Sequence, residues 1–337
     1  MSHRVTLKPS NTTFEVNDEE SVLTAALRQG INLPYGCRSG NCGTCKSMLV
    51  SGDIEYPVAE SLSLTDEEKQ AGATLLCQAH ALSDLVIEAH ELPPEQDIVI
   101  KKLPCRVIAK KLLCHDVIQL KLKLPVMESF AFLAGQYIDI LLPDGRHRSF
   151  SMANAPYGED NLELHIRHVE GGNFTGYVFE ELQEKSILRV EGPRGQFYLR
   201  EDSDLPIIFM AGGTGFAPIK SIIEYTIMHS ITRPMYLYWG VRAQRDLYMH
   251  KHAQVWAQDF SHIQYLPVLS EPQADDDPSL RRGLVHEAIV KDFPDLSGYE
   301  VYASGPPPMV HAGREAFAKC GLPTERYFSD AFEFQAP

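Results

Sequence analysis

Four cysteines near the start of the chain constrain its fold more than any other feature. Cys37, Cys42 and Cys45 follow the spacing C-x4-C-x2-C, and 31 residues separate Cys45 from Cys77. Thiolates on one tight loop and on a distant strand suit iron bridged by sulfide, because soft anionic sulfur stabilises the iron of such clusters. Structural zinc sites more often pair short C-x2-C knuckles, and unrelated buried thiols need no fixed spacing. The spacing therefore predicts that these four cysteines ligate a 2Fe-2S cluster.

Glycines surround the first three cysteines. Gly36, Gly40 and Gly43 can adopt positive φ or let backbone N–H groups turn towards the cluster. Such N–H groups stabilise an anionic centre, so we expect these glycines to serve electrostatics as well as sterics. The other three cysteines, Cys105, Cys114 and Cys320, are scattered, and we interpret them as small buried apolar residues rather than as disulfide partners.

The charge and hydrophobicity of the chain exclude several classes of protein. A net charge of -14 argues against nucleic acid as a partner, because phosphates demand a basic surface. No stretch approaches the roughly 18 uninterrupted apolar residues that a membrane helix needs. No targeting signal is visible at the N-terminus, so a soluble, cytoplasmic protein is expected. Residues 1–93 hold 6 Lys and Arg against 13 Asp and Glu, which favours an acidic docking face for another protein.

Three patterns follow one another along the chain and predict three domains. Residues 1–93 combine short strands with helical stretches around the cysteine loop, and Leu92–Gln96 has the composition of a linker. Residues 102–202 show short alternating runs divided by Gly and Pro, which predicts a small antiparallel β-barrel. Residues 203–337 alternate apolar runs with helical stretches, which predicts an α/β domain with a parallel sheet. The expected strands are Val5–Leu7, Thr13–Val16, Lys46–Val50, Leu85–Ala89, Val117–Leu124, Gln136–Leu142, Leu162–Arg167, Ile187–Glu191, Ile207–Ala211, Met235–Trp239, Ile263–Leu269 and Tyr299–Ala303.

A short motif in the second domain carries a family resemblance. Arg148-Ser149-Phe150-Ser151 resembles the R-x-Y-S flavin motif of the ferredoxin-NADP reductase superfamily. Because it lies between a plant-type ferredoxin cysteine loop and a dinucleotide-type segment, the whole chain resembles a β-grasp ferredoxin fused to a reductase of that superfamily. The resemblance implies that FAD binds here: Arg148 pairs with its pyrophosphate, Phe150 stacks on the flavin ring and the Ser151 hydroxyl reaches the reactive flavin nitrogen. Ser149 is expected in the same FAD site. Phe150 replaces the usual Tyr, which removes a hydroxyl and keeps the stacking.

A second flavin segment lies further along. Gly171-Gly172-Asn173-Phe174-Thr175 resembles the superfamily's second pyrophosphate loop, so Gly172, Phe174 and Thr175 are predicted to contact FAD. His165 and Ile166 are predicted to line the cofactor as well. His165 and His168, like His250 and His252, lack a metal-ligand pattern, which favours a solvated or flavin-lining role.

The third domain opens with a strand, a glycine turn and a helix start. Gly212-Gly213-Thr214-Gly215-Phe216-Ala217-Pro218 resembles the superfamily's G-G-T-G-x-x-P pattern, and its unpaired N–H groups and helix dipole suit the pyrophosphate of a nicotinamide cofactor. We predict binding by Gly212, Gly213, Thr214 and Gly215. A purely structural turn is the alternative.

The nicotinamide ring is expected beside a second motif. Ser304-Gly305-Pro306-Pro307-Pro308-Met309 resembles the superfamily's C-G-P-x-x-M, with Ser304 in place of the cysteine. Gly305 and Pro306 are predicted to bind the cofactor, and the predicted catalytic residues are Phe150, Ser151 and Ser304.

Two further positions complete the predicted nicotinamide and flavin sites. Arg242 follows the strand Met235–Trp239, where no acid stands at the strand's end to hold a ribose diol. NADH is the expected cofactor, and NADPH is the alternative. The tail Tyr327–Phe332 resembles the segment that brings an aromatic ring near the flavin, although Phe332 fits a core position equally well.

The expected function follows from the order of the sites. A nicotinamide gives two electrons as hydride and a 2Fe-2S cluster moves one, so FAD is expected between them, with a protein electron acceptor after the cluster. The full chain resembles the CDP-6-deoxy-glucoseen reductases, which serve a dehydrase, and also the reductases of Rieske dioxygenases and di-iron monooxygenases. The acceptor is thus a dehydrase or an oxygenase component, and a monomer is expected. A ferredoxin carrier without enzymatic activity and a free flavin reductase are the alternatives.

Overall fold

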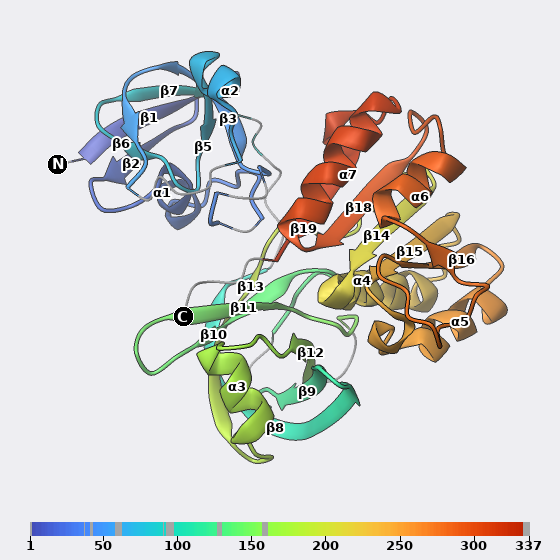
Figure 1. Ribbon diagram of the computed structural model, residues 1–337. Helices are drawn as coiled ribbons and strands as arrows, with labels where there is room; N and C mark the ends of the chain where they lie inside the picture. Colours follow the sequence, from blue (N-terminus) through green and yellow to red (C-terminus); the bar gives the residue numbers. More distant parts are fainter. Residues whose placement is uncertain are drawn as a thin grey trace. The chain divides into compact units, whose positions relative to one another are not determined.

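The computed structural model describes residues 2–36, 38–40, 43–57, 63–89, 91, 98–126, 130–156 and 161–332. They fall into two compact units, Met1–Gln96 and Asp97–Pro337 (Figure 1). Cys37, Cys42 and the predicted linker Leu92–Gln96 lie outside the described residues. Within the described ranges, no helix has both the length and the apolar character needed to span a membrane.

The first unit is built on a five-stranded mixed sheet. Its order is β2-β1-β7-β3-β5, with β1 antiparallel to β2 and parallel to β7. The four strands expected from the sequence are present, whereas β4, β5 and β6 were not predicted because two or three residues are too few to show a period of two. The bounds are β1 (Ser2–Lys8), β2 (Thr13–Asn17), α1 (Val22–Arg28), β3 (Lys46–Ser51), β4 (Ile54–Glu55), α2 (Asp66–Gln70), β5 (Ala73–Leu75), β6 (His80–Ala81) and β7 (Leu85–Glu88).

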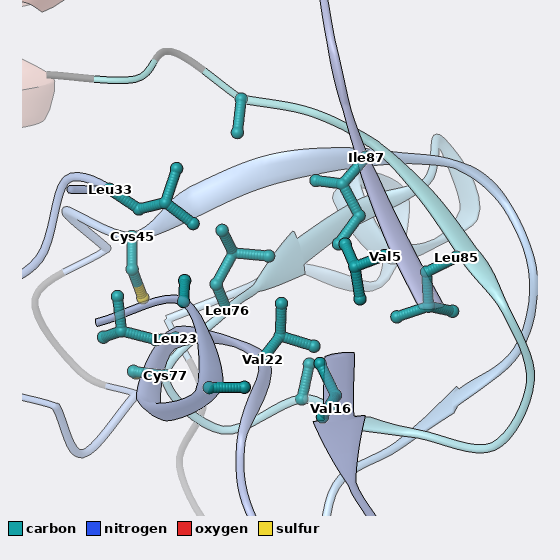
Figure 2. Packing of buried hydrophobic residues seen from close by; sticks show 14 of the residues in the cluster. Val5, Val16, Val22, Leu23, Leu33, Cys45, Leu76, Cys77, Leu85 and Ile87 are labelled. Atoms are coloured by element: carbon teal, nitrogen blue, oxygen red, sulfur yellow. The ribbon is translucent and has the colours of Figure 1, made fainter. Parts of the chain in front are cut away.

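Helix α1 covers the core of this unit. It starts where the Ser21 side chain accepts a hydrogen bond from the Thr24 backbone at 3.2 Å, a cap that typically contributes about 1 kcal/mol. Its buried face packs into one hydrophobic cluster with the central strands, as Figure 2 shows. The cluster includes Val5, Val16, Val22, Leu23, Leu33, Leu76, Leu85 and Ile87.

The first half of the second unit is a six-stranded antiparallel sheet. Its order is β11-β10-β13-β8-β9-β12, and a further bridge joins Met152, just after β11, to Leu164 in β12. Four strands occur where the sequence predicts them. Strands β8 and β11 were not among the expected strands. Leu103, Cys105 and Val107 alternate with exposed residues in the first half of β8, but its second half does not alternate, and β11 is mostly polar. The bounds are β8 (Lys101–Cys114), β9 (Val117–Lys123), β10 (Tyr137–Leu141), β11 (His147–Ser151), β12 (Asn161–Arg167), α3 (Asn173–Glu180) and β13 (Ile187–Arg194).

The second half of this unit is a six-stranded parallel sheet with helices packed against it (Figure 1). Its order is β17-β16-β15-β14-β18-β19, and all five pairings are parallel. Strands β14 and β18 are buried along their whole length, as expected for a sheet covered on both faces. The bounds are β14 (Ile207–Gly212), η1 (Gly213–Gly215), α4 (Phe216–Met228), β15 (Met235–Val241), η2 (Gln244–Asp246), α5 (His250–Asp259), β16 (Ile263–Leu269), β17 (Arg281–Arg282), α6 (Val285–Asp292), β18 (Glu300–Gly305), α7 (Pro307–Lys319), η3 (Thr324–Arg326) and β19 (Tyr327–Ala331).

The two halves of the second unit share a core. Ala134, Phe197 and Leu199 from the antiparallel half pack in the same cluster as Phe209 and Ile222 from the parallel half. Shared packing of this kind holds the two halves in a defined relation.

Candidate cofactor sites

Two of the four predicted cluster ligands lie side by side in the first unit. Cys45 directly precedes β3 and Cys77 closely follows β5, and these strands pair antiparallel with Lys46 opposite Leu75. The Leu76 N–H donates to the Cys45 carbonyl oxygen at 3.3 Å. Both cysteines are buried, with exposed fractions of 2% and 6%, and Figure 2 shows them at one end of the packed cluster. The pairing of β3 with β5 therefore brings the two buried cysteines to neighbouring positions in the fold.

Several described residues of the cysteine loop have left-handed backbone conformations. Gly40 and Gly43 have φ of 88° and 70°, as the sequence predicts, whereas Gly36 is not in the left-handed region. Arg38 has φ of 60°, which is uncommon for a residue with a side chain. The Gln78 side chain donates to the Arg38 carbonyl at 2.8 Å and holds this turn beside Cys77. Positive φ at several positions of a short loop is compatible with backbone N–H groups that face a bound anionic group.

The predicted flavin motif forms strand β11. Arg148 is half-buried and donates to the His147 carbonyl at 2.9 Å. Ser149 donates to the Asp139 carboxylate, which is buried and also lies 3.1 Å from the Arg194 guanidinium. This pairing fixes the strand that presents Phe150 and Ser151.

The two predicted flavin segments meet in space. The rings of Phe150 and Phe174 lie 5.7 Å apart between centroids. Gly172 is the N-cap of α3 and provides no side-chain cap, so the first N–H groups of this helix have no side-chain acceptor there. The Thr175 hydroxyl is engaged within the chain: it hydrogen-bonds to the Val169 backbone and to the Gly172 carbonyl, and so closes the loop. An uncapped helix start beside an aromatic pair fits a flavin with its pyrophosphate.

Ser151 has a partner that the sequence analysis did not single out. Its hydroxyl donates to Asp330 Oδ2 at 3.0 Å, and both residues are buried. Asp330 lies in β19, 179 residues further along the chain. A motif search from the sequence offers no signal for this pair, because only the fold brings β19 beside β11.

A pocket of about 390 Å³ lies at the carboxyl ends of β14, β15, β16 and β18. This edge of a parallel sheet is where open α/β folds bind nucleotides. The predicted residues Gly212, Gly213, Thr214, Arg242 and Pro306 all line it.

Three other predicted residues, Gly215, Ser304 and Gly305, pack next to the glycine turn and are not among the residues that line the pocket. A Cβ on Gly215 would lie 2.0 Å from the Ser304 carbonyl oxygen, and a Cβ on Gly305 would lie 2.8 Å from the Gly212 carbonyl oxygen. Glycine is thus needed for the turn to approach β18. The Ser304 hydroxyl is fully buried and has no hydrogen-bond partner among the described residues. Such a group usually finds a partner, and a bound cofactor can supply one.

Charged side chains surround the pocket unevenly. Asp116, Asp246 and Glu271 contribute three carboxylates, against the guanidinium groups of Arg167 and Arg242. No acid stands directly at the end of β15, but Asp246 in η2 and Glu271 after β16 both line the pocket, and the Glu271 N–H donates to the Arg242 carbonyl at 2.8 Å. The segments that follow two neighbouring strands, β15 and β16, therefore each supply a carboxylate to the pocket.

The remaining predicted residues divide between the core and the edge of the site. Ile166 is fully buried in the core of the antiparallel half. Phe332 is half-buried and belongs to none of the three core clusters, and its N–H donates to the Gly305 carbonyl at 2.9 Å. Its position beside Gly305 favours the site over the core.

His165 is neither solvated nor isolated. One ring nitrogen lies 3.0 Å from Glu163 Oε1, and the other lies 3.1 Å from the Tyr248 hydroxyl. Burial lowers the pKa of His165 below the ordinary histidine value despite the neighbouring carboxylate. Burial alone would raise the pKa of Glu163, but the hydrogen bond from His165 and the charge of Lys220 hold it well below the ordinary value. Glu163 is therefore ionised and His165 neutral at neutral pH.

Comparison with known proteins points to the same three cofactors. Models of three families match: a 2Fe-2S iron-sulfur cluster binding domain at residues 5–82, an oxidoreductase FAD-binding domain at 104–198 and an oxidoreductase NAD-binding domain at 209–315. The chain is 41% identical to the CDP-6-deoxy-L-threo-D-glycero-4-hexulose-3-dehydrase reductase of Yersinia pestis, over 98% of this chain and 99% of the relative. It is 34% identical to reductase component 1 of the terephthalate 1,2-dioxygenase of Comamonas sp., over 98% of each. The crystal structure of an Amycolatopsis cytochrome P450 reductase matches with a TM-score of 0.79 and 31% identity, over 98% of each chain.

Fold and sites together define an NAD(P)H-dependent reductase that transfers electrons through FAD and a 2Fe-2S cluster. It combines a ferredoxin-type domain with flavin-binding and nicotinamide-binding domains in a multidomain α+β arrangement. The chain belongs to the family of iron-sulfur flavoprotein reductases that contains the dehydrase reductases and the oxygenase reductase components.

Proposed function

We propose that this reductase supplies electrons to a sugar-nucleotide dehydrase that acts on a CDP-6-deoxy-hexulose. The observation that carries the proposal is the 41% identity to a reductase of that name over nearly the whole of both chains. A reductase component of a dioxygenase or monooxygenase is the second candidate, supported by 34% identity to a terephthalate dioxygenase reductase over the same length. Identity over the full length includes the ferredoxin-type domain, where a protein acceptor would dock.

Reconstitution with purified partners tests the acceptor. The protein, NADH and a CDP-6-deoxy-hexulose dehydrase should together turn over the dehydrase substrate, whereas a terephthalate dioxygenase should receive electrons much more slowly. Turnover of the oxygenase alone would transfer the assignment to the second candidate.

The domain plan follows the three patterns of the sequence. The domains are a β-grasp ferredoxin at residues 1–93, an FAD-binding β-barrel at 102–202 and a nicotinamide-binding domain at 203–337. In support of the barrel, Met152 and Leu164 bridge the two edges of the antiparallel sheet. We assign the protein to the cytoplasm as a monomer that binds neither nucleic acid nor membrane.

The residues of each site have distinct roles. Cys37, Cys42, Cys45 and Cys77 hold the cluster. Arg148 and the start of α3 hold the FAD pyrophosphate, and the turn Gly212–Gly215 with Pro306 holds that of the nicotinamide. When bound, FAD accepts the two electrons of a hydride and releases electrons singly. Phe150, Ser151 and Ser304 line the reaction centre, where the chain orients the rings and excludes water.

Ser151 and Asp330 form the proton-handling pair of the site. The Ser151 hydroxyl donates to Asp330 Oδ2, and a rotation of this hydroxyl would let it donate to a flavin nitrogen instead. While the buried carboxylate accepts from the hydroxyl it orients Ser151, and it could take up a proton that the hydroxyl passes on from the flavin.

Replacing Asp330 tests this pair. We expect Asp330→Asn to slow anaerobic flavin reduction by NADH by roughly tenfold or more, because acid–base groups in such sites contribute on the order of 10² or more. Stopped-flow absorbance measures the rate, and the exposed Asp275→Asn serves as the matched control. A rate equal to that of the control would remove Asp330 from the mechanism.

We place the ribose of the cofactor beside Glu271, whose carboxylate favours NADH over NADPH. A 2′-phosphate would bring further negative charge to a pocket with three carboxylates, so its binding would be opposed by Glu271. We expect Glu271→Gln to raise kcat/KM for NADPH relative to NADH about fivefold, the equivalent of ~1 kcal/mol at a partly exposed site. Steady-state kinetics with both cofactors measure the ratio, with the exposed Glu287→Gln as control. If the ratio of kcat/KM for NADPH to that for NADH did not change, Glu271 would not contribute to recognition of the ribose.

A further inference from the structure

Two buried polar side chains of α4 contact the segment that follows the flavin motif. Lys220 Nζ donates to the Ala153 carbonyl at 2.9 Å, and Ser221 Oγ donates to the Asn154 carbonyl at 2.7 Å. The Gly135 N–H also donates to Ser221 Oγ at 3.3 Å. Helix α4 thus binds two consecutive carbonyls of the antiparallel half through consecutive residues.

The Lys220 ammonium lies between carboxylates from both halves of the unit. Its Nζ is 3.3 Å from Glu163 Oε1 in β12 and 2.9 Å from Glu224 Oε2 in α4. Glu163 also bonds to His165, whose other ring nitrogen meets Tyr248 of the parallel half. Lys220, Glu163 and His165 are all buried. A connected network of charges and hydrogen bonds therefore crosses the boundary between the two halves.

Core packing does not require a charge at this position. An apolar side chain of similar length would fill the space without the cost of removing an ammonium from water. The ammonium provides three directed donors, and two of its three oxygen neighbours belong to the antiparallel half. Directed bonds of this kind define orientation more closely than apolar contact does.

The two ends of this contact lie next to the two cofactor segments. Helix α4 begins directly after the Gly213–Gly215 turn, and Ala153 lies two residues after Ser151. A helix is rigid over one or two turns, so a constraint at Lys220 is transmitted to the glycine turn.

We propose that Lys220 is a positioning residue for hydride transfer, which holds the nicotinamide-binding turn in fixed relation to the flavin motif. It touches neither cofactor segment itself and acts through α4 and the Ala153–Asn154 backbone. The proposal rests on the proposed assignment of Arg148–Ser151 to FAD. The substrate for this role is the reduced nicotinamide, whose reactive carbon must meet the flavin within a narrow range of distance.

The test separates hydride transfer from binding. The full-length protein with FAD and cluster is mixed anaerobically with NADH in a stopped-flow instrument, and the limiting rate of flavin bleaching and the half-saturating NADH concentration are measured. In Lys220→Met we expect the limiting rate to fall at least tenfold, since misplacement by about 1 Å can cost 10²-fold. The half-saturating concentration should change less than about threefold, because the pocket residues are intact. Lys251→Met, on the exposed side of α5, is the matched control.

A second variant allows for an unstable Lys220→Met. That substitution leaves the buried Glu163 without its buried cation and with only Lys121, 3.8 Å away, whereas Glu163→Gln/Lys220→Met removes both charges of the pair. The double variant should keep the reduced limiting rate with full FAD content. A limiting rate within twofold of the control in the folded double variant, or a defect confined to NADH affinity, would overturn the proposal. If FAD were bound elsewhere, Arg148→Met would keep its FAD. This result would overturn the flavin assignment and is distinct from the results that overturn the role of Lys220.

Discussion

Cys77→Ser abolishes electron delivery to a one-electron protein acceptor while NADH still reduces ferricyanide. A serine hydroxyl is a hard, poorly acidic ligand and cannot replace a thiolate on iron. Cys77 is buried beside Cys45 through the pairing of β3 with β5, so loss of its sulfur removes a ligand where no other described cysteine is present to replace it. The flavin and nicotinamide sites belong to the other unit and keep their structure. We expect cytochrome c reduction to fall by about 100-fold or more, because electrons reach this acceptor through the cluster. Ferricyanide reduction should stay within about twofold of wild type, because ferricyanide accepts electrons from the flavin.

The matched control for this variant is Cys320→Ser. Cys320 is half-buried at the end of α7 and belongs to no predicted site. It should leave both activities and the iron content unchanged. Cytochrome reduction that survives in Cys77→Ser, or loss of both activities in a folded, flavin-bound protein, contradicts the order of electron transfer.

Arg148→Met releases FAD. A guanidinium bonded to pyrophosphate oxygens is a charge-assisted contact worth about 1.5–3 kcal/mol, which corresponds to roughly 10- to 150-fold in affinity. Methionine keeps the apolar volume of the side chain, so β11 should retain its pairing with β10. The variant should purify largely without yellow colour and regain activity when FAD is added in excess.

Absorbance at the flavin bands and titration with added FAD measure this effect. Arg146→Met is the control, because Arg146 lies exposed in the turn before β11 and pairs with Asp144. Equal FAD content in the two variants contradicts the assignment of Arg148 to the pyrophosphate.

Much of the fold was predictable because it depends on local sequence patterns. The buried strands Ile207–Gly212 and Glu300–Gly305 are short apolar runs before glycine turns, and their sequence alone predicts strands in a parallel sheet. Strand β11 was singled out through its flavin motif, because His147–Ser151 has mostly polar side chains and shows no apolar alternation. What a residue contacts across the sheet is not encoded in such local patterns.

The candidate sites divide in the same way. The cysteine spacing and the Gly212–Gly215 turn are contiguous motifs whose chemistry is visible in the sequence. Asp330 and Lys220 were missed because each meets its partner across more than 60 residues of chain. Glu271 was not predicted because it follows β16, whereas an acid that holds the ribose is expected after β15. Pairs of this kind depend on the order of strands in the sheet.

The central claim is that one polypeptide carries electrons from the nicotinamide through FAD to the 2Fe-2S cluster. Its most direct test is anaerobic reduction of the purified protein by NADH, with flavin absorbance and the electron paramagnetic resonance signal of the reduced cluster followed in time. We predict that flavin bleaching precedes the cluster signal, and that FAD-depleted Arg148→Met shows no cluster signal until FAD is restored. A cluster reduced by NADH at the same rate in the absence of FAD would contradict this route.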